Sequence, residues 1–136
     1  LEIARVYERM EQHRLGDRLQ VDWQLGPLPE DTPVPGLVIQ PLLENAIYHG
    51  IEPMPQPGRI QVSGESVDGM VRISVSNPLP PSASAPRHGN RIALDNIRER
   101  LELAFGVRGV LSVIDSVPGM FTVTIEFPAG AQVLPA

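Results

Sequence analysis

The sequence predicts an α+β fold: a two-layer α/β sandwich with a mixed, mainly antiparallel sheet of about five strands, covered on one face by about three helices. Three observations lead to this prediction. Three segments repeat apolar residues at helical spacing, five shorter segments alternate apolar and polar residues, and the two kinds of segment are interspersed along the chain. The 136 residues, 42% of them hydrophobic, suffice for one domain with a real core.

The first two segments predict a helix and a strand. Residues 1–15 place apolar side chains near helical spacing among Glu, Arg and Gln, and Gly16-Asp17 ends that pattern. Residues 18–25 alternate strictly between apolar and polar side chains, which is typical of a half-buried strand. Residues 26–35 contain four prolines and predict a connecting loop.

Residues 35–50, PGLVIQPLLENAIYHG, predict an amphipathic helix with one apolar and one polar stripe. The apolar stripe consists of Ile39, Leu42, Leu43, Ala46 and Ile47, and the polar stripe of Pro41, Glu44, Asn45, Tyr48 and His49. Pro41 either delays the regular helix to near Ile39 or kinks it, because proline lacks the N–H group and clashes with the preceding turn. The polar stripe has no Lys or Arg, and its short hydrogen-bonding groups favour a ligand-facing helix over a merely solvated face.

The second half of the chain predicts two hairpins separated by a helix. Residues 59–66 and 70–76 alternate as strands around Asp68-Gly69, the favoured pair for a tight turn. Residues 52–58 and 78–86 are rich in proline and predict a loop and a flexible segment. Residues 92–105 return to helical spacing and are expected to end at Gly106. The face expected to be buried consists of Ile92, Leu94, Ile97, Leu101 and Ala104.

Residues 109–115 and 120–127 close the pattern as two alternating strands around Pro118-Gly119, and the residues after Pro128 are expected to fray. The 11 basic and 16 acidic residues give a net charge of -5, which disfavours nucleic acid as a partner. The absence of cysteine excludes disulfides and thiolate metal sites. The chain begins without methionine, and we expect it to be a fragment of a longer protein.

Residues 37–50, LVIQPLLENAIYHG, resemble the N box of the LytS/YehU-type sensor histidine kinases, whose ATP-binding domains belong to the GHKL group. The resemblance covers nearly the whole chain. Outside the N box it includes Tyr7, Arg14, Gly16, Asp17, Arg18, Leu19, Asn96, Arg100, Leu101, Gly119 and Pro128. It implies a Bergerat-type sandwich with a Mg-ATP site between the N-box helix and a lid.

The resemblance also implies roles for three residues of this helix. Asn45 would be the Mg²⁺ ligand, because its amide oxygen is the hard donor that this ion accepts beside phosphates and waters. Glu44 would be the general base for an incoming histidine. His49 is a candidate phosphate contact; the alternative is a histidine that only closes the helix near the C-terminal end of its dipole.

Two later motifs depart from the family pattern. Where relatives carry an Asp followed by Gly-x-Gly, residues 75–80 read VSNPLP, so Asn77 would accept a hydrogen bond from the adenine amino group without the charge of a carboxylate. The second glycine motif is represented by residues 89–96, GNRIALDN, in which only Gly89 keeps its glycine. Arg91 and Ala93 obstruct the close backbone approach to phosphates that the missing glycines would allow.

The resemblance still assigns nucleotide contacts to the second motif, at Gly89, Arg91, Leu94 and Asn96. Arg91 either offers its guanidinium group to a phosphate or lies solvated at the edge of the lid. An apolar slot for the base would be lined by Ile51, Ile73, Val75 and Leu94, each of which can equally belong to the core. Tyr48 stands where relatives usually carry Lys, and Met120 where they often carry Thr, so the site loses a cation and becomes more apolar.

Taken together, the resemblance implies the ATP-binding catalytic domain of a two-component sensor histidine kinase. We expect residues 1–16 to lead in from a dimerisation region, residues 17–130 to form the catalytic domain and residues 131–136 to be a tail. The expected partners are ATP, a phosphoacceptor histidine on the dimerisation helix and a response regulator. The parent would be an inner-membrane-anchored bacterial homodimer with this domain in the cytoplasm. Whether residues 1–136 alone form a monomer is left open. The alternative is a degenerate, non-catalytic signalling module with weak or no ATP binding.

Overall fold

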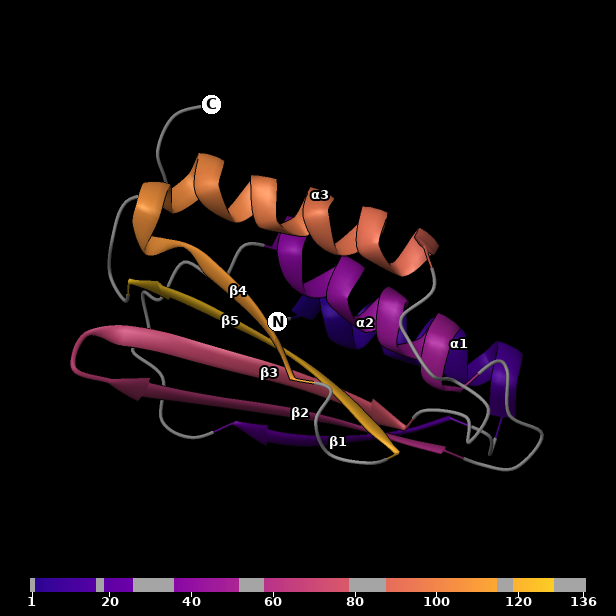
Figure 1. The fold of residues 1–136 in the computed structure, drawn as a ribbon. Coiled ribbons are helices and arrows are strands. Elements are labelled where there is room, and N and C mark those ends of the chain that lie inside the picture. The colour runs from indigo at the N-terminus through magenta and orange to yellow at the C-terminus, as the bar shows by residue number, and fades with distance from the viewer. Residues whose placement is uncertain are drawn as a thin grey trace.

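Helices and strands are arranged in two layers in the computed structural model, which describes residues 2–16, 19–25, 36–51, 58–78, 88–114 and 119–128. Within these ranges there are three α-helices and five strands, as expected (Figure 1). In chain order they are α1 (Glu2–Leu15), β1 (Leu19–Leu25), α2 (Gly36–Gly50), β2 (Gly58–Val67), β3 (Met70–Pro78), α3 (His88–Phe105), the 3-10 turn η2 (Gly106–Arg108), β4 (Val110–Ile114) and β5 (Met120–Pro128).

The five strands form one mixed sheet in the order β1-β2-β3-β5-β4. β1 pairs with β2 in parallel, and the other three pairs are antiparallel. A parallel pair needs a crossover connection, and α2 lies in the segment between β1 and β2. All three helices lie on one face of the sheet (Figure 1), so the predicted mixed, mainly antiparallel sandwich is confirmed.

The core lies between the helices and the covered face of the sheet. The apolar stripe predicted for α2 is buried throughout, with Ile39, Leu42, Leu43, Ala46 and Ile47 each at most 2% exposed. The sheet contributes alternate residues of its central strands, among them Val71, Ile73, Ile125 and Phe127. At one end of this layer Phe105 of α3 stacks on Phe127 of β5 with ring centroids 5.0 Å apart.

The β2–β3 hairpin turns at Asp68 and Gly69, as predicted. Both residues have positive φ, 52° and 79°, which is the signature of a type I′ turn. This turn matches the right-handed twist of the two strands, and it sets a register in which Val67 faces Met70. A purely local pair of residues therefore fixes the pairing of two central strands.

Several element boundaries differ from the expectation. α2 begins at Gly36 and continues through Pro41, so the proposed start near Ile39 is wrong. Since Pro41 lies in the second turn, few helical hydrogen bonds precede it and the missing N–H removes one of them. Gly58 belongs to β2 instead of the preceding loop. Gly109 is not part of β4; an added Cβ there would lie 2.6 Å from the Leu101 carbonyl oxygen.

The segments around the two departing motifs also differ. β3 extends to Pro78, where the sequence predicted a flexible segment, and Asn77 and Pro78 pair with Phe121 and Met120 of β5. A proline is tolerated there because it lies at the end of the strand. α3 begins at His88, one turn earlier than expected. The expected loops at residues 26–35, 52–57 and 79–87, residues 115–118, and the tail lie outside the described residues.

One apolar residue of α3 was assigned to the wrong face. Ile92 is 52% exposed, whereas Leu94, Ile97 and Leu101 are buried. Residues two apart in sequence are separated by about 200° around a helix, so Ile92 and Leu94 cannot share a face. The correct buried stripe begins at Leu94.

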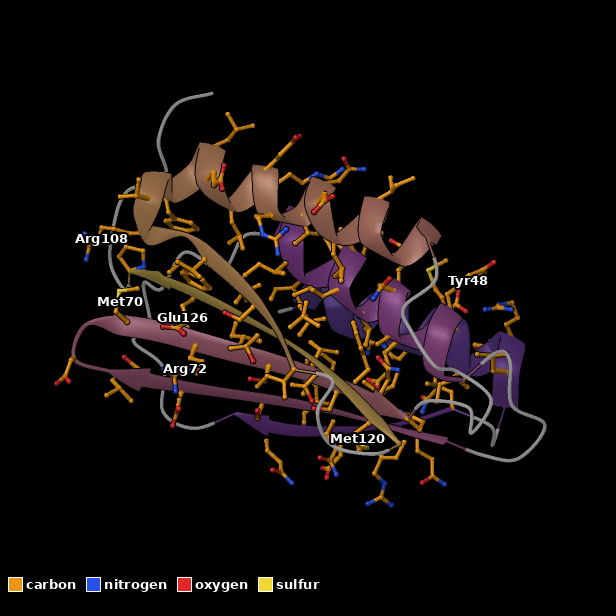
Figure 2. All side chains as sticks on the ribbon, viewed as in Figure 1. Tyr48, Met70, Arg72, Arg108, Met120 and Glu126 are labelled. Carbon is orange, nitrogen blue, oxygen red and sulfur yellow. The ribbon has the colours of Figure 1, made fainter. Side chains whose placement is uncertain are left out.

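The opposite face of the sheet carries short polar side chains. Ser74 and Thr124 lie 2.9 Å apart and Ser76 and Thr122 lie 2.8 Å apart, each pair hydrogen-bonded across β3 and β5. Arg72 forms ion pairs with Glu65 and Glu126 on its two neighbouring strands, and Figure 2 labels Arg72 and Glu126 on this face. This face of the sheet is therefore held together by its own cross-strand contacts.

Candidate functional site

Helix α2 carries the adjacent pair Glu44 and Asn45, and the structure gives the two residues different environments. Glu44 is exposed, whereas Asn45 is a buried polar residue that is only 7% exposed. The helix packs against α1, α3 and β3, and successive residues lie about 100° apart around its axis. The prediction that both lie on one polar stripe, apart from the apolar one, is thus wrong for Asn45, which lies at the edge of the buried side.

The side-chain oxygen of Asn45 is the feature that marks this position as a site. Its Oδ1 atom is buried and has no hydrogen-bond partner among the described residues. Leaving a buried acceptor unpaired costs about 1–3 kcal/mol, and such atoms are uncommon in folded proteins. An amide oxygen is also a hard donor suited to Mg²⁺. The residue present therefore fits the metal that the fold family implies.

The remaining ligands of such an ion would not come from a protein cage. Within the described residues, no group of three or more His, Cys, Asp or Glu side chains could hold a metal ion. Mg²⁺ commonly takes one or two protein ligands together with phosphates and waters. Asn45 alone on the protein side is compatible with this mode of binding.

Tyr48 lies one helical turn after Glu44 and is 56% exposed (Figure 2). It shares the exposed stripe of α2 with Glu44, as predicted. Its phenol cannot replace the positive charge of a lysine, so this part of the stripe presents a carboxylate and an aromatic ring. Ile51, directly after the helix, is fully buried and donates its backbone N–H to the Ile47 carbonyl oxygen at 3.0 Å.

Asn77 lies in β3 and is only 1% exposed. Its Nδ2 atom donates a hydrogen bond to the carbonyl oxygen of Pro78 at 2.8 Å. This contact engages the donor side of the amide. The residue is therefore held in place as part of a strand, where the sequence had suggested an irregular connection.

The residues of the second glycine motif are not all brought together. Leu94 is buried in the core at 6% exposure, whereas Asn96 is exposed. They lie two positions apart in α3 and therefore point to different sides of the helix. Gly89 and Arg91 belong to the first turn of α3, and His49 to the last turn of α2. The structure does not describe the side chains of Arg91 and His49. The roles of Gly89, Arg91 and His49 therefore stay predictions.

The four residues expected to line an apolar slot are all buried. Ile51 and Ile73 are fully buried, and Val75 and Leu94 are 3% and 6% exposed. The sequence allowed each of these residues to belong either to the slot or to the core, and their burial agrees with a place in the core. What sequence reasoning missed was the burial of Asn45, and an amide flanked by Leu42, Leu43, Ala46 and Ile47 was the available signal.

Comparison with known proteins gives relatives of one kind. The sensor histidine kinase YpdA of Escherichia coli (strain K12) is 34% identical over 108 residues, covering 74% of this chain and 19% of YpdA. The sensor histidine kinase YesM of Bacillus subtilis (strain 168) is 32% identical over 108 residues, covering 77% of this chain and 19% of YesM. The chain thus spans about a fifth of the length of these curated relatives. No protein-family model matches it.

The fold has counterparts among solved structures. The nucleotide-free catalytic domain of the histidine kinase ThkA superposes with a TM-score of 0.70 at 19% identity, covering 94% of this chain and 90% of that domain. This likeness concerns the fold, and the sequence relatives concern the family. The chain is therefore homologous to one segment of sensor histidine kinases such as YpdA and YesM, and its fold is that of a histidine kinase catalytic domain.

Proposed function

We propose that this chain is the ATP-binding catalytic domain of a two-component sensor histidine kinase, and that it presents the γ-phosphate of ATP to a histidine outside residues 1–136. The observation that carries the proposal is the buried, unpaired Oδ1 atom of Asn45 beside the exposed carboxylate of Glu44. The amide oxygen would hold a cation, and the exposed carboxylate would be accessible to an incoming side chain.

Asn45 would hold Mg²⁺ through Oδ1. The ion, when bound, neutralises charge on the phosphates and so favours phosphoryl transfer. The protein's own contribution is to keep the amide fixed: Asn45 lies among side chains of α2 that are at most 2% exposed. A ligand held this way needs little reorganisation on binding.

Glu44 would act as the general base that accepts a proton from the incoming histidine. A base must reach the proton it abstracts, and Glu44 is on the exposed stripe of α2, open to another element or protomer. Its neighbour Asn45 keeps the two functions within one residue of each other. Base and metal ligand would thus be positioned by the same rigid helix.

Asn77 would recognise the adenine amino group through its carbonyl oxygen. The hydrogen bond from Nδ2 to the Pro78 carbonyl oxygen supports this role, because it fixes the orientation of the amide through its donor side. His49, Gly89, Arg91, Leu94 and Asn96 would complete the nucleotide site. Residues 1–16 would lead in from the dimerisation region, with residues 17–130 as the catalytic domain and residues 131–136 as the tail.

The wider assignment follows the family. The parent would be an inner-membrane-anchored homodimer that passes its phosphoryl group to a response regulator, with this domain on the cytoplasmic side. Within the described residues, no helix combines the length and the apolar character needed to cross a membrane. We further propose that the parent is a sensor like AlgZ (FimS), the sensor of the alginate regulator, and that it controls alginate biosynthesis. A parent-gene deletion that leaves alginate output unchanged would remove this last assignment.

Calorimetric titration of the chain with Mg-ADP and Mg-ATP tests nucleotide binding. We expect micromolar affinity, and a Kd at least about tenfold higher for Asn45→Ala, because the variant loses its only proposed metal donor. Gln12→Ala is the matched control, since it removes an exposed amide from helix α1. Binding by the wild type that Asn45→Ala leaves unchanged contradicts the metal role.

Phosphoryl transfer is tested in the full-length parent with radiolabelled ATP. Glu44→Gln should keep nucleotide affinity within about threefold and lower the rate of histidine phosphorylation by about 10²-fold or more, because the isosteric amide cannot accept the proton. A Glu44→Gln parent that phosphorylates at the wild-type rate contradicts the role of this residue as a base.

A degenerate module without useful ATP binding is the second candidate. It is favoured by Pro78, which forms the end of β3. In the family pattern this position is a flexible glycine beside the residue that binds adenine. Restoring glycine at Arg91 and Ala93 separates the two candidates. Much tighter nucleotide binding by the Arg91→Gly, Ala93→Gly variant means that these residues are defects, and weaker binding means that Arg91 is a phosphate ligand.

A further inference from the structure

Strand β4 forms one free edge of the sheet. Among the described residues it pairs only with β5, whereas β1 forms the opposite edge (Figure 1). The two edges differ in how they are protected. β1 carries Asp22, and its Trp23 donates a hydrogen bond to Glu8 of α1 at 3.1 Å. β4 reads VLSVI, without charge or proline, and so lacks two of the usual devices that block strand pairing.

The β4 edge also exposes apolar side chains on both faces of the sheet. Val110, Val113 and Ile114 are 44%, 38% and 48% exposed. Val107, just before the strand, is 94% exposed. Beside it lies a hollow of about 550 Å³, lined by Arg98, Glu102, Gly106, Val107, Gly109, Val110 and Leu111. An uncharged edge strand with exposed apolar residues is an interaction surface in need of a partner strand.

The order of residues in β4 identifies the partner. Read from either end, the strand presents a β-branched residue, a second aliphatic residue, and Ser112 at the centre. In an antiparallel pair centred on Ser112, Val110 faces Ile114 of the second copy and Leu111 faces its Val113, so every apolar residue meets an apolar one. We propose that β4 pairs with β4 of a second copy of this chain, through a two-fold axis at Ser112.

The geometry of the sheet permits this pairing in either hydrogen-bonding phase. Whether Ser112 or its neighbours direct their backbone groups outward, a register centred on Ser112 keeps the same residues opposite one another. The two-fold axis is perpendicular to the sheet, so the helices of both copies lie on the same face. The result is one continuous sheet in which neither copy has an unpaired β4 edge.

The contact is small, because β4 has five residues. We expect a dissociation constant on the order of 100 μM for the isolated chain, at the weak end of specific interfaces. In a homodimeric parent, a premise that rests on the proposed function, the two domains would face effective concentrations of about 1 mM, and the pairing would then be populated. Failure of nucleotide binding leaves the β4 contact untouched, so the two proposals are tested separately.

Sedimentation equilibrium of the 136-residue chain tests the pairing. The wild type should rise from 14.8 kDa toward twice that mass as concentration increases. Ser112→Lys and Ser112→Glu should each associate about fivefold more weakly or worse, because like charges then meet at the axis. An equimolar mixture of the two should associate at least as tightly as the wild type. Gln24→Lys, on the exposed side of β1, adds the same charge at the opposite edge and should self-associate normally.

A second set of variants tests the register and does not depend on Ser112. Val110→Lys and Ile114→Glu should each weaken association, and the double variant should recover it, because the introduced lysine meets the introduced glutamate of the other copy. Circular dichroism melts near that of the wild type confirm that each variant is folded. A wild type that stays monomeric at about 1 mM overturns the proposal. So does a Ser112→Lys variant that associates like the wild type, or a double variant no better than its parents.

Discussion

Asn45→Ala should make the nucleotide-free domain more stable while weakening its response to nucleotide. The variant eliminates the buried Oδ1 atom, which has no partner among the described residues and costs about 1–3 kcal/mol. It also leaves a void of about 25 Å³, worth about 0.6 kcal/mol at 24 cal/mol per Å³. Alanine's better helix propensity returns roughly 0.6 kcal/mol. These two smaller effects cancel, so the gain is about 1–3 kcal/mol.

Thermal melts with and without Mg-ADP measure both effects in one experiment. Without nucleotide, Asn45→Ala should melt about 3–10 °C above the wild type. At 100 times the wild-type Kd, nucleotide stabilises the wild type by about 2.7 kcal/mol and a variant with a tenfold higher Kd by only about 1.4 kcal/mol. The difference between the melting temperatures of the variant and the wild type therefore becomes smaller or changes sign when nucleotide is added. Gln12→Ala, which removes an exposed amide, should change stability by less than about 0.5 kcal/mol and respond to nucleotide normally.

Two outcomes would refute this reasoning, and they refute different parts of it. If nucleotide-free Asn45→Ala melts well below the wild type, the amide oxygen is satisfied in the folded protein and stores no unfavourable energy. If the variant gains as much stability from Mg-ADP as the wild type does, the oxygen is unpaired but holds no metal. A folding defect would give the first outcome without bearing on the second.

Three further predictions concern the packing of the fold. Trp23→Phe keeps an aromatic ring but loses the donor to Glu8, so urea unfolding should show a loss of about 1.5–3 kcal/mol, and Glu8→Gln a smaller one. Gly109→Ala brings a Cβ to 2.6 Å from the Leu101 carbonyl oxygen, and chemical denaturation should show a loss of about 1–3 kcal/mol; a neutral result would mean that this backbone yields easily. Gly69→Ala meets no atom within 4 Å but keeps a φ of 79°, so its melt should reveal about 1–2 kcal/mol of pure backbone strain.

The sequence predicts well what is decided locally. The turn at Asp68-Gly69 depends on two residues that tolerate positive φ, and the alternation on either side belongs to the same hairpin. The prediction that Ile92 is buried was wrong, and the reason is also local: Ile92 and Leu94 are two residues apart, so they cannot share a helix face. The extension of β3 to Pro78 could not be read locally, since its partner Met120 lies far along the chain.

The sequence identifies the candidate site residues but does not predict which of them are buried. Glu44 and Asn45 can be identified from the residues around them, yet a helical projection places both on one stripe. Which of the two is covered depends on where α3 and β3 pack against α2, and those elements come later in the chain. The distinction between a wet carboxylate and a buried amide oxygen is therefore a tertiary property.

The parallel pairing of β1 with β2 has a consequence for the order in which the domain assembles. β2 with β3, and β4 with β5, are joined by short connections, so these hairpins can close with little loss of chain entropy. β1 can join only after the chain has passed through α2 and returned as β2. The helix that bears Glu44 and Asn45 thus lies in the crossover between the two parallel strands, whose pairing has the larger loop-closure cost. Partial unfolding that releases β1 would expose the edge of β2 while the four antiparallel strands stay paired.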